Sequence, residues 1–316
     1  VNTSSFIAGR YFRSKKKQNF ITILSLISMV GVAISTMALV AVMSVFNGLE
    51  DLIRGLFSSF DSELQVTPTS GKSFVVTEEW LHALRQVEGV KVITEVIEDN
   101  ALLEYRGNQH VARVKAVSEN YFEHDRFSKG YFWGDTTLGD SLRPGALLGR
   151  GVAFALSANL DDINSVLNIY YPKAPKSAAS LDPNQLYASG QVEPRGFFSI
   201  EQGVDNEYVL VPLDFFKELL GYGQKRTALE LKVDSEHSIS TVQKAVQAHL
   251  GADFAVKNAD EQHATLIRTV KLEKLFVFLT LTFILALASF NIFFSLSMLA
   301  IEKKKDLAVL KAMGAK

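Results

Sequence analysis

The chain has 316 residues, of which 47% are hydrophobic and 21% charged, with no cysteine and a formal net charge of −1. This hydrophobic fraction excludes a disordered chain, and the small net charge argues against a nucleic-acid binder that works through overall basicity. The lack of cysteine excludes disulfides, Cys-ligated metal sites and thiol nucleophiles.

Two charge-free segments carry most of the hydrophobicity. Residues 20–46 contain 14 Val, Ile, Leu or Phe residues, and residues 275–301 contain 17. A helix needs about 20 apolar residues to cross the hydrocarbon core, so each segment predicts a transmembrane helix. The first segment is too long for the apolar region of a signal peptide.

Lys and Arg at the ends of these segments predict the orientation. Residues 1–19 carry five basic residues and no acid, and residues 302–316 carry five Lys against two acids. The overall charge of −1 then leaves −9 for residues 20–301. Because positive flanks stay in the cytoplasm, we expect both ends inside the cell and a large domain outside the membrane.

The first part of the external domain, residues 50–144, alternates strand and helix signals. Thr77 is a candidate N-cap for a helix that Gly89 terminates. A Gly107–Asn108 turn separates two β-rich runs. The predicted elements are strand 63–68, helix 78–87 and strands 91–98, 101–106 and 110–117.

The last part, residues 213–274, repeats this layout. Ser238 is a candidate N-cap for a helix ending at Leu250. The predicted elements are strand 228–233, helix 238–250, strand 254–257 and a polar helix 261–274. The expected fold is therefore α+β, with two β-α-β units that bracket a β-rich insertion at residues 145–212.

A proline-rich stretch, residues 172–194, lies within this insertion. Its prolines predict that it cannot sit inside a sheet. Two interpretations remain open: a mobile surface loop, or a stiffened segment that docks a partner. Candidate docking residues are Pro172, Pro175, Leu181, Pro183, Leu186, Tyr187 and Pro194.

Small and polar residues divide the predicted spans into faces. Ser28, Gly31, Ser35 and Ala38 share one face of the first span and predict close packing against another helix. Asn291 of the second span is either an interhelical hydrogen-bonding group or a residue facing a substrate cavity. Candidate cavity residues are Met37, Val40, Met43, Ser44 and Asn291.

Signatures of catalysis are missing from the sequence. It contains no G-x-x-x-x-G-K-[ST], no H-E-x-x-H and no G-x-S-x-G, and its six histidines are scattered. We therefore expect a non-enzymatic chain with no catalytic, metal or cofactor site of its own.

Four stretches resemble the LolC/LolE lipoprotein-releasing permeases of the MacB/FtsX-like ABC transporters. They are the basic lead RYFRSKKKQ, the segment VMSVFNGLE at residues 42–50, ALLGRGVAFALSANLDD at residues 146–162, and EKKKDLAVLKAMGA at residues 302–315. The order of span, external domain, span and cytoplasmic helix covers the whole chain. The resemblance implies a MacB-like periplasmic core.

The resemblance implies that this chain transmits force and catalyses no reaction itself. A separate LolD-like ATPase binds ATP and Mg²⁺ and docks on the coupling helix, residues 302–316. An acylated lipoprotein leaves the inner membrane, and a LolA-like periplasmic carrier receives it at a hook placed at residues 172–194. A second permease subunit, identical or different, completes the transporter, and no nucleic acid takes part. The coupling residues are Lys303, Lys305, Asp306, Leu307, Leu310, Lys311, Met313 and Gly314.

Three alternatives stay open at this point. The segment after the second span also fits a basic helix lying on anionic lipid. The chain also fits a related mechanotransmission subunit for efflux or cell-wall hydrolase control, or a two-span sensor. The family has four spans, and we expect that the last two are absent either from this chain or from its gene.

Overall fold

The computed structural model describes residues 6, 10, 20–57, 60–124, 130–139, 142–162, 166–173 and 187–314. The chain divides into two compact units. One, the helical unit, combines Val1–Asp51 with Thr265–Lys316, and the other, the head, is Leu52–Ala264.

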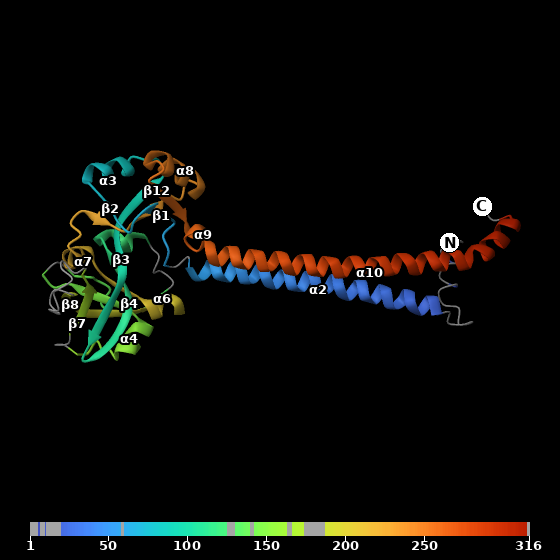
Figure 1. Ribbon diagram of the computed structural model, residues 1–316, viewed down its shortest axis with the longest axis horizontal. Helices are drawn as coiled ribbons and strands as arrows, with labels where there is room; N and C mark the ends of the chain where they lie inside the picture. The colour runs from blue at the N-terminus through green and yellow to red at the C-terminus, as the bar shows by residue number, and fades with distance from the viewer. Residues whose placement is uncertain are drawn as a thin grey trace, which may run out of the picture. The chain divides into compact units, whose positions relative to one another are not determined.

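Two antiparallel helices, α2 (Phe20–Phe57) and α10 (Ala264–Ala312), lie side by side in the helical unit (Figure 1). Their segments Leu26–Gly55 and Ala264–Met298 are long and apolar enough to cross a membrane. At 1.5 Å per residue the two helices measure about 57 and 74 Å, against a hydrocarbon core of about 30 Å. Both helices therefore continue past the predicted spans without a break.

One half of the head is a four-stranded antiparallel sheet with two helices packed on the same face (Figure 1). The strands lie in the order β12–β1–β11–β3. Helix α3 connects β1 to β3, and α8 connects β11 to β12, as two split β-α-β units. The bounds are β1 Leu64–Pro68, α3 Glu78–Arg85, β3 Val90–Tyr105, β11 Ala228–Val233, α8 Ile239–Leu250 and β12 Phe254–Asn258.

Local sequence accounts for these two helices. The Thr77 side chain accepts a hydrogen bond from the Trp80 amide at 3.3 Å and so caps α3. Leu81 and Leu84 of α3 are buried in the core under the sheet, and so are Val242 and Val246 of α8, which are spaced one helical turn apart. Both predicted helices are thus present.

The other half of the head is a closed barrel of six strands. The pairing runs β3–β4–β9–β6–β8–β7 and returns to β3, so the strands form a complete ring. Side chains from all six strands form one buried core. The new strands are β4 Asn108–Val117, β6 Gly145–Gly149, β7 Leu167–Pro172, β8 Tyr187–Ser199 and β9 Tyr208–Pro212.

Short elements surround these two halves. Strand β5 pairs with β8, and β2 pairs with β10. The remaining helices contact strands of the barrel, except for α9, which contacts β12 and β1 of the open sheet. Their bounds are β2 Phe74–Val75, η1 Glu119–His124, β5 Tyr131–Gly134, α4 Arg150–Leu156, α6 Gln202–Glu207, α7 Leu213–Leu220, β10 Lys225–Arg226 and α9 Ala259–Gln262.

The predicted α+β fold is confirmed, with three differences in detail. The two β-α-β units are interleaved in one sheet, because β11 lies between β1 and β3. The predicted strands 91–98 and 101–106 form one continuous strand, β3, which belongs to both the open sheet and the barrel. The hairpin turn consists of Arg106 and Gly107, not Gly107 and Asn108, because Tyr105 pairs directly with Asn108.

Candidate functional site

The small residues predicted for helix packing lie on the less exposed face of α2. Ser28 is buried, and Gly31, Ser35 and Ala38 are half-buried. On α10 the residues of low exposure recur every three or four positions from Lys274 to Ser295, as in an antiparallel helix pair. Small side chains at such positions let two helices approach closely.

The predicted cavity residues lie mostly away from this face. Met37 and Val40 are 66% and 61% exposed, Ser44 is also exposed, and Met43 is half-buried. Asn291 of α10 is exposed as well. In a bilayer these side chains would meet lipid tails or neighbouring helices, and their role as a cavity stays a prediction.

A polar contact joins α2 and α10 at the boundary of their charge-free segments. The Lys274 ammonium donates to Asn47 Oδ1 at 2.7 Å and lies 3.4 Å from Glu50 Oε2. The Lys274 and Glu50 side chains are only 24% and 18% exposed. Partial burial strengthens this ion pair relative to one on an open surface. It fixes the register of the two helices at this point.

The predicted coupling segment is the last part of α10 and not a separate helix. The helix runs unbroken through residue 301 to Ala312, so the predicted segment continues the second apolar helix. Lys305, Lys311, Met313 and Gly314 are exposed, and Gly314 follows the helix with a φ of 90°. The side chains of Lys303, Asp306, Leu307 and Leu310 lie outside those that the structure describes.

The predicted hook is a β-hairpin made of β7 and β8. Its last pair is Pro172 with Tyr187, and its pairing continues to Leu167 with Val192. Paired strand therefore extends further into residues 172–194 than predicted. Pro194 lies inside β8, where a register shift between β8 and β6 accommodates it. Pro175, Leu181, Pro183 and Leu186 lie outside the described residues.

The base of this hairpin is held firmly to the barrel. A Cβ added to Gly190 would lie 2.8 Å from the Phe215 ring and 3.3 Å from Leu219, so only glycine lets β8 approach α7 this closely. On the other strand, the Tyr171 hydroxyl donates to Asp99 Oδ2 at 2.7 Å. The described part of the hairpin is therefore fixed on the barrel, which suits a docking element.

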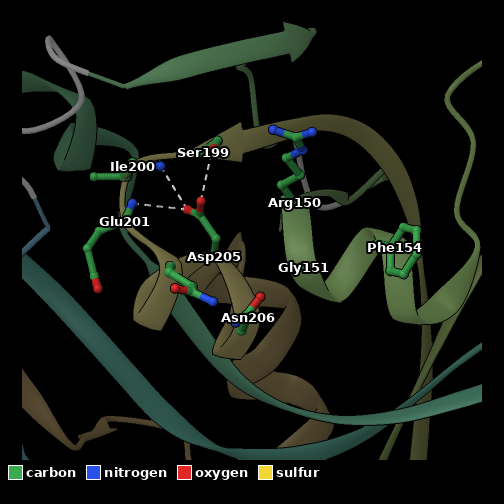
Figure 2. Close-up of a pocket in the computed structure, with 9 residues that line it drawn as sticks. Arg150, Gly151, Phe154, Ser199, Ile200, Glu201, Asp205 and Asn206 are labelled. Atoms are coloured by element: carbon green, nitrogen blue, oxygen red, sulfur yellow. Dashed lines mark hydrogen bonds between the residues drawn. The ribbon is translucent and has the colours of Figure 1, made fainter.

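A surface pocket lies where α4, the end of β8 and α6 meet (Figure 2). Asp205 organises its wall: its carboxylate accepts hydrogen bonds from the Ile200 amide at 2.7 Å and the Ser199 hydroxyl at 2.7 Å. Since these bonds are internal to the turn, Asp205 serves the fold. The pocket contains none of the sequence-predicted site residues, and its lining is Arg150, Gly151, Phe154, Ser199, Ile200, Glu201, Gln202, Asp205 and Asn206.

The motif at residues 146–162 has a structural explanation beside this pocket. A Cβ on Gly149 would overlap the backbone carbonyl of Asp205, and one on Gly151 would overlap the side chain of Asn206. Both glycines therefore permit α4 to pack directly on α6.

Charged side chains are buried at the junction of the sheet and the barrel. Lys115 Nζ lies 2.8 Å from Glu230 Oε1 and 4.4 Å from the centre of the Phe60 ring. Glu98, opposite Lys115 on the neighbouring strand, accepts a hydrogen bond from the Tyr208 hydroxyl at 3.2 Å. Burial raises the pKa of Glu98 above its ordinary value of 4.5, despite the opposing effect of Lys115.

Sequence reasoning missed the Lys274 contact and the Lys115–Glu230 pair. Both ends of the first contact were visible in the sequence. Glu50 is the first acidic residue after the first charge-free segment, and Lys274 is the last basic residue before the second. Lys115 and Glu230 carried no local signal, because they lie 115 positions apart in the sequence. Among the described residues, no group of three His, Cys, Asp or Glu side chains is arranged to hold a metal ion.

Comparison with known proteins agrees with this architecture. The model of the MacB-like periplasmic core domain matches residues 25–249. LolC of Neisseria meningitidis, a lipoprotein-releasing system transmembrane protein, is 26% identical over 98% of this chain and 74% of its own length. LolE of Haemophilus influenzae is 23% identical over 100% of this chain and 75% of its own length.

Among solved structures, the periplasmic region of MacB from Actinobacillus actinomycetemcomitans matches 66% of this chain and 94% of its own, with 12% identity and a TM-score of 0.45. The family model covers well over half of the chain, and the named relatives extend along nearly all of it. The chain therefore belongs to the MacB-like periplasmic core domain family, in its LolC/LolE group.

Proposed function

We propose that this chain is a permease subunit of an ABC transporter that extracts lipoproteins from the inner membrane and passes them to a periplasmic carrier. The observation that carries this proposal is the extent of the similarity to LolC and LolE, which includes both apolar helices as well as the head. That extent favours lipoprotein release over a related mechanotransmission subunit or a two-span sensor.

In this proposal both ends of the chain lie in the cytoplasm and the head lies in the periplasm. The positive charge of residues 1–19 and 302–316 supports this orientation. The exposed side chains of Met37, Val40 and Asn291 would face the acyl chains of the lipoprotein or a second permease subunit, identical or different.

The inner end of α10 is the proposed contact with a LolD-like ATPase, which would bind ATP and Mg²⁺. Because α10 is one uninterrupted helix, a displacement of its inner end passes along its axis without a hinge. The exposed residues here suit this contact, because Lys305 and Lys311 are cationic and Met313 supplies an apolar side chain beside them.

The β7–β8 hairpin is the proposed contact with a LolA-like carrier. Its base is fixed by Gly190 and Tyr171, and Tyr187 at the last described pair is 49% exposed. A rigid base lowers the entropy lost when the hairpin docks.

Depletion of this chain in its own host tests the function. Outer-membrane lipoproteins should then accumulate in the inner membrane, and expression of the intact chain should restore their sorting. Normal sorting combined with failed cell separation would instead support hydrolase control and overturn the proposal.

Photo-crosslinking tests the carrier contact. A photoreactive residue at Tyr187 should capture the carrier during release, whereas the same residue at Val75, 57% exposed in the other half of the head, should not. Equal capture at both positions would contradict a specific role of the hairpin.

Charge reversal tests the ATPase contact. Lys305→Glu together with Lys311→Glu should reduce copurification of the ATPase, while Lys72→Glu on an exposed turn of the head is the matched control. ATPase binding that ignores the inner-end reversals would instead favour a helix that lies on anionic lipid.

A further inference from the structure

The chain enters and leaves the head at the same place. The first strand of the head, β1, is the antiparallel neighbour of the last, β12. Their register places Leu64, at the start of β1, opposite Asn258, at the end of β12. The residues that precede β1 and follow β12 therefore lie next to each other, although about 200 positions separate them.

Side-chain contacts continue this pairing beyond the two strands. Asp61 Oδ2 lies 2.6 Å from His263 Nε2, and the Gln262 side-chain amide donates to the Ser62 carbonyl at 2.8 Å. Further out, Arg54 Nη1 lies 2.6 Å from Asp260 Oδ2. We call these six residues the clasp: Arg54, Asp61, Ser62, Asp260, Gln262 and His263.

The inner part of the clasp is less exposed than its outer end. Ser62 is completely inaccessible, and the side chains of Asp61 and His263 are 12% and 29% exposed. The Arg54 and Asp260 side chains, at 41% and 42% exposed, form its open outer end. Water therefore competes less for the Asp61–His263 contact than for the Arg54–Asp260 contact at the outer end.

The segment that enters the head is anchored on its own side. Phe60 is 3% exposed and its ring lies 4.6 Å from that of Tyr208, between centres. Glu63 accepts a hydrogen bond from the Val233 amide at 2.6 Å. Asp61 and Ser62 are thus held between two residues that are bound to the barrel and to the sheet.

The segment that leaves the head is anchored as well. Asn258 and Glu261 form a capping box that starts α9, so the first turn after β12 has a defined conformation. Gln243 of α8 donates to Glu261 Oε2 at 2.5 Å. Both sides of the clasp are therefore rigid elements of the head.

We infer that the clasp joins the two connections between head and spans into one mechanical unit, with Asp61 and His263 as its positioning residues. This inference rests on the proposed function, in which ATP-driven motion of the spans must reach the head. Without these contacts, a force applied to either helix would reach the head through the end of a single strand and would load the terminal Leu64–Asn258 pair of the β1–β12 ladder first. With the clasp closed, the two strands move together and the load is shared by their whole ladder.

The inference requires that the clasp stays closed throughout the ATP cycle. The chain has no cysteine, so thiol pairs can be introduced without background. Arg54→Cys with Asp260→Cys places thiols at the exposed outer end and leaves Asp61 and His263 intact. A short bismaleimide should link this pair equally well in the nucleotide-free and ATP-trapped transporter, and a clear fall in yield with ATP would overturn the inference.

A second pair tests whether closure matters for release. Asp61→Cys with His263→Cys removes the buried contact and should lower lipoprotein release per ATP hydrolysed by roughly fivefold, the effect of a moderate loss of coupling. Linking the two thiols with the bismaleimide should restore most of the release. The single variant Asp61→Cys, treated with the same reagent, should not recover.

The outcomes separate this inference from the function on which it rests. Wild-type transporter that releases no lipoprotein would refute the proposed function, while the nucleotide dependence of the outer-end crosslink still tests the clasp. Wild-type release with no recovery of the linked Asp61→Cys/His263→Cys variant would refute the clasp alone. A merely structural contact would change the thermal stability of the head without changing the ratio of release to ATP hydrolysis.

Discussion

Lys115 and Glu230 form an ion pair, with 2.8 Å between Nζ and Oε1, although their side chains are only 4% and 1% exposed. The Lys115 ammonium also lies 5.3 Å from the centre of the Tyr121 ring. Since a charge in the protein interior is tolerated only when it is paired, each member of the pair makes the other possible.

Removing one member should therefore cost more than removing both. We expect Lys115→Met to lower the free energy of unfolding by about 3–5 kcal/mol, because the Glu230 carboxylate stays buried after it loses the Lys115 ammonium. The double variant Lys115→Met/Glu230→Met should recover most of that loss. Both tryptophans of the chain, Trp80 and Trp133, lie in the head, so their fluorescence during urea unfolding measures this change. Equal losses in the single and double variants would contradict the argument.

Glu98 should make the head lose stability as the pH rises. Its pKa in the folded head is raised by burial, so folding favours the protonated form. That contribution is complete below the ordinary value of 4.5 and is lost as the pH rises through the raised pKa. We therefore expect the free energy of unfolding of Glu98→Gln, minus that of wild type, to increase as the pH rises through this interval. Urea unfolding of both proteins at a series of pH values measures this difference. A difference that shrinks with rising pH would have the wrong sign.

The turn between β3 and β4 should require glycine at position 107, because the backbone there has a positive φ. Arg106 and Gly107 have φ values of 50° and 84°, the left-handed pair that a two-residue hairpin turn needs. A Cβ at Gly107 would meet no atom within 4 Å, so Gly107→Ala costs backbone conformation alone, about 1–2 kcal/mol. Gly107→Asn, which tolerates this region better, is the control in urea unfolding. An alanine variant as stable as the asparagine variant would contradict this assignment.

Local signals were sufficient to predict α2, α3, α8, α10 and the strands of the open sheet, but they did not predict α4, α6 or α7. The charge-free segments predicted α2 and α10, and Thr77 and the spacing of Val242 and Val246 predicted α3 and α8. Each of these signals depends only on residues within a few turns of one another. The identity of the two apolar helices therefore did not depend on the tertiary fold.

Long-range pairing was not visible in the sequence. Nothing local to β11 indicates that it lies between β1 and β3, and the closure of the barrel depends on contacts among six separate strands. Pro194 was assigned to a loop because proline breaks a regular ladder, but the register shift beside it removes that conflict. In the candidate site, the sequence predicted where the docking segment lies. It did not predict the clasp, because Asp61 and His263 are 202 positions apart and meet only in the folded head.

Strand β12 shows how the head protects the edge of its sheet. Among the described strands, β12 pairs with β1 alone. On its other side Gln247 imitates a neighbouring strand: its side chain accepts from the Val256 amide at 3.0 Å and donates to the Phe254 carbonyl at 2.9 Å. Gln243 donates to the Val256 carbonyl at 2.9 Å. These bonds occupy backbone groups that would otherwise be free to pair with another chain.

Gln247→Ala should therefore open this edge. The variant leaves the Val256 amide and the Phe254 carbonyl without their partners, and we expect a loss of about 1–3 kcal/mol in the free energy of unfolding. We also expect concentration-dependent self-association in detergent, measured by sedimentation velocity, because an exposed strand edge is a template for another strand. Lys244→Ala, on an exposed position of the same helix, should change neither property. A Gln247→Ala variant as monodisperse and as stable as Lys244→Ala would show that the glutamine side chains do not protect the edge. The resistance of the head to self-association would then have to come from the charge of the surface around β12.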